Sequence, residues 1–356
     1  MTDRSLNLLL MSTPVGTLGS GIGGGVELTL FNLAQSLQQR GHQIQVVAPT
    51  HSILPGIPIE EIPGHLQIPA QTQTPQDPII LPANSVLGNM WEYARSVQTE
   101  YDLIVNFAYD WLPLYLTPFF EKPIAHFISM GALTLAMNEV IAKVHQQFPQ
   151  TLGFYTRTQA ATFGIDHPRT LQSGLDLSLY EFCETPGTEL AWVGRIAPEK
   201  GLEDAVAAAT QMGIPLKILG KLQDQNYWQQ ICQQFPDTIL DYRGFLSTAN
   251  LQRELRECRA LIMTPRWVEA FGNVAIEALA CGVPVISYHR GGPSEIIEPG
   301  KTGFLVEPDS ISGLVSAIEQ LDTLDRWQCR QTAETRYSLP AMGASFEQWF
   351  YDILKV

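Results

Sequence analysis

The chain has 356 residues, of which 45% are hydrophobic and 16% are charged, and its formal net charge is −14. These values predict a globular protein of two domains and exclude a disordered chain. The negative charge argues against a nucleic-acid partner, because a protein that binds a phosphate backbone needs a basic face.

Strands and helices are expected to alternate through the first half of the chain. A helix is expected over 26–41, where apolar residues roughly follow a 3.6-residue period. Its expected apolar stripe consists of Leu28, Phe31, Leu33 and Leu37. The Pro-rich segment 53–82 has little periodicity and is expected to be irregular. Strands are expected over 6–12, 42–49, 102–108 and 123–129.

The same alternation starts again near Glu189, so a second sheet is expected there. Its strands are expected over 189–195, 215–220, 238–245, 260–265 and 284–288, with helices over 202–213 and 274–282. The whole pattern predicts an α/β fold with two Rossmann-like, doubly wound parallel sheets. Such sheets bind ligands at the carboxyl ends of their strands, so functional residues are expected just after strands.

The domain boundary is expected in the segment LSLYEFCETPGTE, residues 177–189, because its end is charged and contains Pro and Gly. This predicts an N-terminal domain over 1–178 and a C-terminal domain over 186–339. The aromatic-rich helix near 340–356 could pack on either domain, and we expect it to return to the first.

The five cysteines are scattered and form no C-x-x-C pair or zinc-spaced cluster. We therefore expect a reduced, cytoplasmic protein without a metal site. The apolar run LNLLLMS is too short to cross a membrane, and a peripheral membrane contact stays open. The cysteines are Cys183, Cys232, Cys258, Cys281 and Cys329.

The segment GSGIGG matches the dinucleotide-binding pattern G-x-G-x-x-G at Gly19, Gly21 and Gly24. An NAD-dependent oxidoreductase would also need an acidic residue about 20 residues beyond these glycines, at the end of the second strand. That strand, in QIQVVAPTHS, ends without one, and the glycines begin several residues after the first strand. We therefore favour a flexible phosphate loop, with Gly24 and Gly25 at the start of the helix.

Two cations follow the first strand of the second half. In WVGRIAPEKG, Arg195 comes directly after the strand and Lys200 just before a helix. Two positive charges near the free N–H groups of a helix start suit a diphosphate. Taken alone, the two residues could equally be surface cations of a solvated loop.

Two carboxylates occur in TPRWVEAFGNVAIEALACG. Glu269 precedes a Gly272-Asn273 turn, and Glu277 lies about one turn into the helix that follows. Gly272 lets a ligand approach the backbone closely, and the N–H groups of Asn273 and Val274 are expected to be free at the helix start. The two carboxylates could bind the ends of a polyol, or be ordinary glutamates of an amphipathic helix.

Taken together, the patterns R-x4-KG, E-x7-E and CGVPVIS-x3-GG-x2-E resemble the retaining glycosyltransferases of the family-4 type, which have two Rossmann-like domains (GT-B). GGGVE, KTGFLVEP and LQSGLDLSLYEF are also similar to that family, the last with Ser173 in place of the usual Asn. The resemblance covers nearly the whole chain.

The resemblance implies sugar transfer from a nucleoside diphosphate sugar with retention at the anomeric carbon. By this analogy Arg195 and Lys200 clamp the diphosphate, Glu277 binds the ribose, and Glu269 supports catalysis at the sugar hydroxyls. The rest of the implied donor pocket comprises Gly24, Gly25, Phe271, Gly272, Asn273 and Val274. The sequence contains no D-x-D motif, so we expect the cations to act without a metal and the UDP-sugar to be a substrate, with no cofactor.

The acceptor side departs from the family pattern. Many members have a His after the strand that here reads PIAHFISMG, where Ser129 stands, and His126 is expected in the core. Ser129 and Asp110 are weak acceptor-site candidates, and Asp110 could instead cap a helix. UDP-glucose is the favoured donor over GDP- and ADP-sugars. The opening loop is similar to a subgroup that glucosylates reduced pterins such as tetrahydrobiopterin.

Other functions stay open at this point. A lipid or saccharide acceptor would keep the transferase reaction, although no basic amphipathic helix suited to an anionic membrane occurs in the sequence. A nucleotide-sugar epimerase would act without an acceptor, and a non-catalytic protein would only bind the nucleotide sugar. The oligomeric state also stays open.

Overall fold

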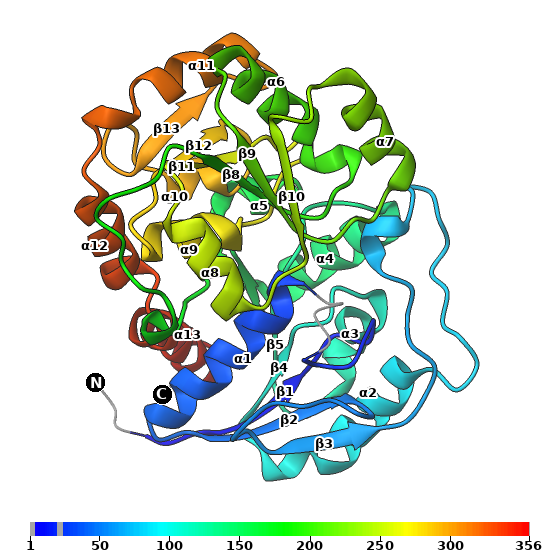
Figure 1. The fold of residues 1–356 in the computed structure, drawn as a ribbon. Coiled ribbons are helices and arrows are strands. Elements are labelled where there is room, and N and C mark those ends of the chain that lie inside the picture. The colour runs from blue at the N-terminus through cyan, green and yellow to red at the C-terminus, as the bar shows by residue number, and fades with distance from the viewer. Residues whose placement is uncertain (1–3, 20–23, 356) are drawn as a thin grey trace. The chain divides into compact units, whose positions relative to one another are not determined.

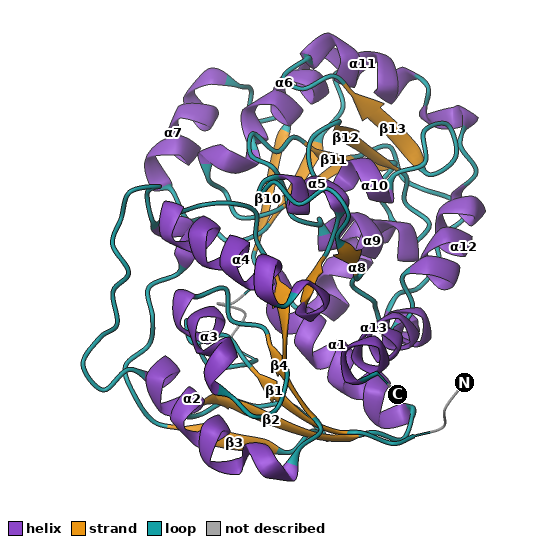
Figure 2. Cartoon of the chain, turned by 180° about the vertical axis from the view of Figure 1, so that it is seen from behind, coloured by secondary structure: helices purple, strands orange, loops and turns teal. Residues whose placement is uncertain are grey.

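The computed structural model describes residues 4–19 and 24–355 and divides the chain into two compact units (Figure 1). Unit 1 comprises Met1–Gly174 and Leu339–Val356, and unit 2 comprises Leu175–Ser338. The domains predicted from the sequence were 1–178 and 186–339. Each unit is a parallel sheet with helices around it, which confirms the predicted fold class (Figure 2).

Unit 1 contains a seven-stranded parallel sheet in the order β3-β2-β1-β4-β5-β6-β7. Its strands are β1 Asn7–Met11, β2 Gln43–Pro49, β3 Ile59–Ile62, β4 Leu103–Asn106, β5 Ile124–Ile128, β6 Leu152–Phe154 and β7 Arg169–Thr170. Its helices are α1 Gly25–Gln39, α2 Val86–Val97, α3 Trp111–Leu116, α4 Leu135–Gln147, α5 Arg157–Ala161 and α13 Leu339–Leu354. The strand β3 lies inside the segment that was expected to be irregular, where it pairs with β2 at the edge of the sheet.

Both faces of this sheet are covered. Leu8, Leu9, Leu10 and Met11 of β1 are all fully buried. Leu9 and Met11 belong to the core cluster under α2, and since side chains alternate along a strand, Leu8 and Leu10 face the other side. A continuous apolar run is therefore the signal of a strand buried on both faces.

The helix α1 has two neighbours, β2 and α13, and the contact with α13 changes which of its residues are buried. It packs on α13 (Figure 1). There the Ser36 hydroxyl donates a hydrogen bond to the Leu339 carbonyl at 2.6 Å. Its buried apolar residues are Leu30, Leu33, Ala34 and Leu37. The expected stripe was wrong at Leu28 and Phe31, which are only half-buried.

Unit 2 contains a six-stranded parallel sheet in the order β10-β9-β8-β11-β12-β13. Its strands are β8 Leu190–Val193, β9 Leu216–Leu219, β10 Leu240–Gly244, β11 Ala260–Met263, β12 Val285–Tyr288 and β13 Gly303–Val306. Its helices are α6 Leu202–Met212, α7 Gln225–Gln234, α8 Thr248–Arg256, α9 Asn273–Ala280, α10 Pro293–Ile296, α11 Ile311–Glu319 and α12 Arg326–Arg336. No helix in the described parts of the chain is both long and apolar enough to cross a bilayer.

Candidate functional site

The motif residues of unit 2 meet at the point where its strand order reverses. The chain runs outward from β8 through β9 to β10, and then resumes on the other side of β8 with β11. Arg195 and Lys200 follow β8, and Glu269 follows β11, so both groups lie at the carboxyl ends of the two strands that flank the switch point. This is the position at which doubly wound sheets bind ligands.

Lys200 and Glu269 form an ion pair at this position. Their side chains are 20% and 16% exposed, so the pair is largely withdrawn from water. The indole Nε1 of Trp267 donates a second hydrogen bond to Glu269 Oε2 at 3.1 Å. The Lys200 ammonium also lies 4.9 Å from the centre of the Trp267 ring, a cation–π distance.

These contacts keep Glu269 ionised. Burial alone would raise the pKa of Glu269, but the charge of Lys200 and the hydrogen bonds from Lys200 and Trp267 outweigh it, so the pKa is lowered. The charge of Arg195 acts in the same direction. A carboxylate in this state accepts hydrogen bonds from a ligand and does not act as a general acid.

Arg195 is oriented by two partners in unit 2. Its guanidinium contacts Glu199 at 3.0 Å and donates to Gln223 Oε1 at 2.6 Å. Its side chain is 29% exposed, so the charge stays within reach of an anionic ligand. The sequence had indicated the cation but neither of the partners that hold it.

The segments after β8 and β11 are joined to each other by hydrogen bonds to backbone carbonyls of the first segment. The Thr264 hydroxyl donates to the Gly201 carbonyl at 2.7 Å, and the Arg266 N–H donates to the Glu199 carbonyl at 2.9 Å. Gly201 has φ of 61°, and a Cβ there would lie 2.2 Å from the Thr264 oxygen. Glycine is therefore required beside Lys200 for the two segments to approach.

Side chains reinforce this joint. Arg266 donates to both carboxylate oxygens of Asp204 at 3.0 Å, and the Tyr288 hydroxyl donates to Asp204 at 2.8 Å. Asp204 is buried in the first turn of α6. Both contacts come from one guanidinium nitrogen, Nη2, and they tie the segment leading to Glu269 to the helix that follows Lys200.

The glycine pair Gly291-Gly292 supports the backbone of Glu269. The Gly292 N–H donates to the Glu269 carbonyl at 2.6 Å. A Cβ at Gly291 would lie 2.4 Å from that same carbonyl oxygen, and a Cβ at Gly292 would lie 2.3 Å from the Phe271 carbonyl oxygen. The two glycines are therefore needed because the loop that carries Glu269 rests directly on them.

The turn after Glu269 leads into α9. Phe271 is buried and packs edge-on against Tyr337, with ring centroids 6.1 Å apart. Gly272 precedes the helix with φ of 101°, and its carbonyl accepts from the Ala275 N–H at 2.9 Å. Asn273 and Val274 form the first turn of α9 and are half-buried. The helix therefore starts where the sequence predicted, close to Glu269 in the chain.

Glu277 lies on α9 and is only 7% exposed. The Tyr180 hydroxyl donates to its Oε1 at 3.0 Å. Burial raises the pKa of Glu277 to about 7, although the Tyr180 hydrogen bond opposes the shift. The two glutamates of the motif thus differ in charge state: Glu269 stays ionised well below neutrality, and Glu277 titrates near it.

The candidate residues of unit 1 lie at several places on that unit. Gly24 is exposed, with φ of 67°, and directly precedes α1, where Gly25 is the first residue. Gly21 lies outside the described residues. Ser129 directly follows β5 and is half-buried, and Asp110 precedes α3.

His126 is a core residue, as expected. It is fully buried on β5, where Asn106 Nδ2 lies 3.2 Å from its Nδ1 and Thr117 Oγ1 lies 2.9 Å from its Nε2. Burial lowers the pKa of His126 to about 3, so the ring is neutral.

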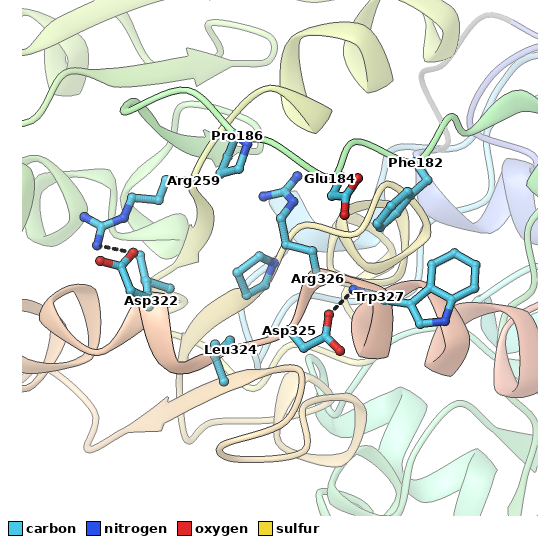
Figure 3. Close-up of a pocket in the computed structure, with 11 residues that line it drawn as sticks. Phe182, Glu184, Pro186, Arg259, Asp322, Leu324, Asp325, Arg326 and Trp327 are labelled. Atoms are coloured by element: carbon cyan, nitrogen blue, oxygen red, sulfur yellow. Dashed lines mark hydrogen bonds and ion pairs between the residues drawn. The ribbon is translucent and has the colours of Figure 1, made fainter.

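A cavity of about 470 Å³ lies elsewhere in unit 2, between the start of α12 and the segment before β8 (Figure 3). Arg259 and Asp322 form an ion pair at 2.9 Å on its wall, and Asp325 caps α12 through the Trp327 N–H at 2.9 Å. Arg326 donates to three backbone carbonyls, those of Cys183, Cys258 and Arg256. None of the motif residues lines this cavity, so we keep the motif residues as the candidate site.

Two contributors to the site were not predicted from the sequence. Trp267 stands only two residues before Glu269, and this short separation in the chain was an available signal for contact. Tyr180 is separated from Glu277 by 97 residues, so only the folded structure brings them together.

Sequence comparison finds known proteins that are similar to this chain. Residues 185–336 match the family model of glycosyl transferases group 1. A glycogen synthase of Mycobacterium tuberculosis is 31% identical over 170 residues, which is 44% of this chain and 40% of that protein. A D-inositol 3-phosphate glycosyltransferase of Pseudarthrobacter chlorophenolicus is 24% identical over 88% of this chain and 86% of its own. The chain thus spans about two fifths of the glycogen synthase.

Solved structures share the fold of the whole chain. Anabaena Alr3699/HepE, in complex with UDP and glucose, superposes with a TM-score of 0.77 at 18% identity, over 98% of this chain and 100% of that one. Sucrose-phosphate synthase from Thermosynechococcus elongatus gives a TM-score of 0.78 at 18% identity, over 99% and 100%. The chain has the two-domain fold of these proteins, and residues 185–336 match the family model of glycosyl transferases group 1.

Proposed function

We propose that this chain is a retaining glycosyltransferase that transfers glucose from UDP-glucose to a small-molecule acceptor. The observation that carries the proposal is the meeting of Arg195, Lys200 and Glu269 at the switch point of the sheet in the segment that matches the group 1 family model. UDP-glucose is favoured because the neighbour Anabaena Alr3699/HepE was crystallised with UDP and glucose.

The two cations stabilise the leaving group of the proposed reaction. Breaking the bond to the sugar leaves negative charge on UDP, and Arg195 and Lys200 stabilise it together with the N–H groups at the start of α9. This role needs no cofactor and no metal, in keeping with the lack of a D-x-D motif in the sequence. Glu277, with its ionisation near neutrality, binds the ribose hydroxyls.

Glu269 acts as electrostatic and hydrogen-bonding support at the sugar. Its lowered pKa keeps it a carboxylate, and Lys200 and Trp267 fix its orientation. In the proposed reaction the acceptor attacks on the face that the leaving phosphate occupies, and that phosphate takes the acceptor's proton. Glu269→Gln should therefore cut kcat sharply while UDP binding persists, and unchanged turnover would contradict this role.

The favoured acceptor is a reduced pterin such as tetrahydrobiopterin. The support is the similarity of the opening loop to that subgroup. A saccharide acceptor is the second candidate, because the relatives include a glycogen synthase and an inositol phosphate glycosyltransferase. With five free cysteines, the chain is proposed to work in the reducing cytoplasm.

The proposal is tested by incubating the protein with UDP-, GDP- and ADP-glucose, each with and without tetrahydrobiopterin or glucose. The expected result is release of UDP that depends on an acceptor. Isomerisation of the nucleotide sugar without an acceptor would instead identify an epimerase. Binding of UDP-glucose without any turnover would identify a non-catalytic binding protein.

A further inference from the structure

The sheet of unit 1 has a switch point of its own. Its strand order reverses between β1 and β4, as the order of unit 2 reverses between β8 and β11. Thr13 comes two residues after β1, and Asp110 comes four residues after β4. These residues therefore stand in the place in unit 1 that Arg195 and Glu269 occupy in unit 2, where ligands of doubly wound sheets bind.

Gln67 reaches this place from the long segment between β3 and α2. Its backbone N–H donates to the Pro14 carbonyl at 2.9 Å, directly beside Thr13 in the chain. Its side-chain Nε2 donates to Asp110 Oδ2 and to the Ile80 carbonyl, both at 3.1 Å. Both amide protons of Gln67 are thus used, and the residue joins the ends of β1 and β4.

Two buried oxygens here have no hydrogen-bond partner among the residues that the structure describes. They are Gln67 Oε1 and Thr13 Oγ1, and each residue is only 7% exposed. Leaving such an atom unpaired costs about 1–3 kcal/mol, so each one needs a reason, such as a bound ligand or an ordered water. Their position at a ligand-binding edge supplies that reason.

Gln98 is a second buried glutamine of unit 1, and its hydrogen bonds can be compared with those of Gln67. It is 8% exposed, and its oxygen accepts from the Glu121 N–H at 2.8 Å and the Lys122 N–H at 3.3 Å. Its Nε2 donates to the Arg95 carbonyl at 3.0 Å. In Gln98, therefore, both the amide oxygen and the amide nitrogen have partners.

The atoms at the switch point define the ligand. A carboxylate and an amide oxygen only accept hydrogen bonds, and a threonine hydroxyl accepts or donates. A ligand that satisfies them must therefore carry several N–H or O–H donors. Burial raises the pKa of Asp110 despite the hydrogen bonds it accepts, so this environment disfavours a further negative charge.

We propose that Thr13, Gln67 and Asp110 form the subsite that holds the acceptor through paired hydrogen-bond donors, such as the amino and ring N–H groups of a heterocycle or the adjacent hydroxyls of a sugar. The inference rests on the proposed function, because it names the acceptor chemistry of that reaction. Both unpaired oxygens are buried, so ligand entry requires the segment that carries Gln67 to move.

The test measures binding without a donor, by calorimetry, with tetrahydrobiopterin as the heterocycle probe and glucose as the sugar probe. Gln67→Leu and Asp110→Asn should each weaken binding of the probe that the wild type binds by at least tenfold. Thr13→Val, which keeps the shape of the side chain, should weaken it several-fold. Gln98→Leu is the matched control, expected to lower the thermal midpoint and leave probe binding at the wild-type value.

UDP binding is measured on the same proteins and should be unchanged by all four substitutions. Binding of tetrahydrobiopterin, or of glucose, that depends on Gln67 and Asp110 supports the subsite and identifies the class of donor. Equal binding by the wild type and these variants, or binding of neither probe to the wild type, would overturn the inference. Failure of the wild type to bind UDP would contradict the proposed function instead.

Discussion

Replacing Trp267 by phenylalanine separates the two contacts that the indole makes. Phenylalanine keeps an aromatic ring beneath Lys200 but removes the N–H that donates to Glu269 at 3.1 Å. A hydrogen bond to a charged acceptor contributes roughly 1.5–3 kcal/mol, and one pKa unit corresponds to about 1.36 kcal/mol. Because Glu269 is partly exposed and keeps Lys200, we take the lower end, which is an upward shift of about one pKa unit.

The measurement is the pH dependence of kcat/KM for glucose transfer. Glu269 must be ionised to support the sugar, so activity falls as the pH drops through its pKa, which the fold holds below the ordinary value. Raising that pKa moves the acid limb toward neutrality by about one pH unit. The matched control is Trp228→Phe on α7, whose ring packs on Tyr242 at 5.2 Å.

An acid limb that stays in place in Trp267→Phe would refute the assignment of the indole N–H to Glu269. A shift of the same size in Trp228→Phe would show that loss of any tryptophan in unit 2 disturbs the site. General loosening of the fold would lower kcat at all pH values without moving the limb.

Two other substitutions test the motif residues. The folded-state pKa of Glu277 is about 7, above its ordinary value of 4.5, so the stability it contributes is full below pH 4.5 and is lost as the pH rises through 7. Glu277→Gln should therefore raise the thermal midpoint of unfolding at pH 8, by the equivalent of about 3 kcal/mol at most, and change it little at pH 5. Equal effects of the substitution at the two pH values would contradict the argument that burial raises this pKa. Gly292→Ala should weaken UDP binding at least tenfold, because the new Cβ would lie 2.3 Å from the Phe271 carbonyl oxygen. The control is Gly88→Ala in α2, where the new Cβ makes only ordinary contacts and UDP binding should not change. Similar UDP affinities in these two variants would show that the loop tolerates displacement.

The sequence was most informative where a segment's structure depends on its own residues. The strands β1 and β11 are apolar and buried on both faces, and β8 is nearly so, so their composition alone indicates parallel strands. The placement of Arg195 and Glu269 followed, because residues after such strands meet at one sheet edge. The fold class and the strands that flank the site were predictable for this reason.

Features that depend on distant partners were missed. The strand β3 reads IEEI, without a clear alternation, and it forms because β2 offers an edge to pair with. The buried face of α1 turned from the expected stripe because α13 covers part of it, some 300 residues later in the chain. Neither Tyr180 beside Glu277 nor Gln67 beside Asp110 left a local signal in the sequence.

The return of α13 to unit 1 sets an order for folding during synthesis. All of unit 2, Leu175–Ser338, is made before the helix that completes unit 1. Phe346, Trp349 and Phe350 of that helix are fully or almost fully buried, and the Trp349 Nε1 donates to the Gln150 carbonyl at 2.8 Å. The N-terminal unit therefore reaches its final structure last, and a ribosome that stops before residue 339 would release a complete C-terminal unit attached to an unfinished N-terminal one.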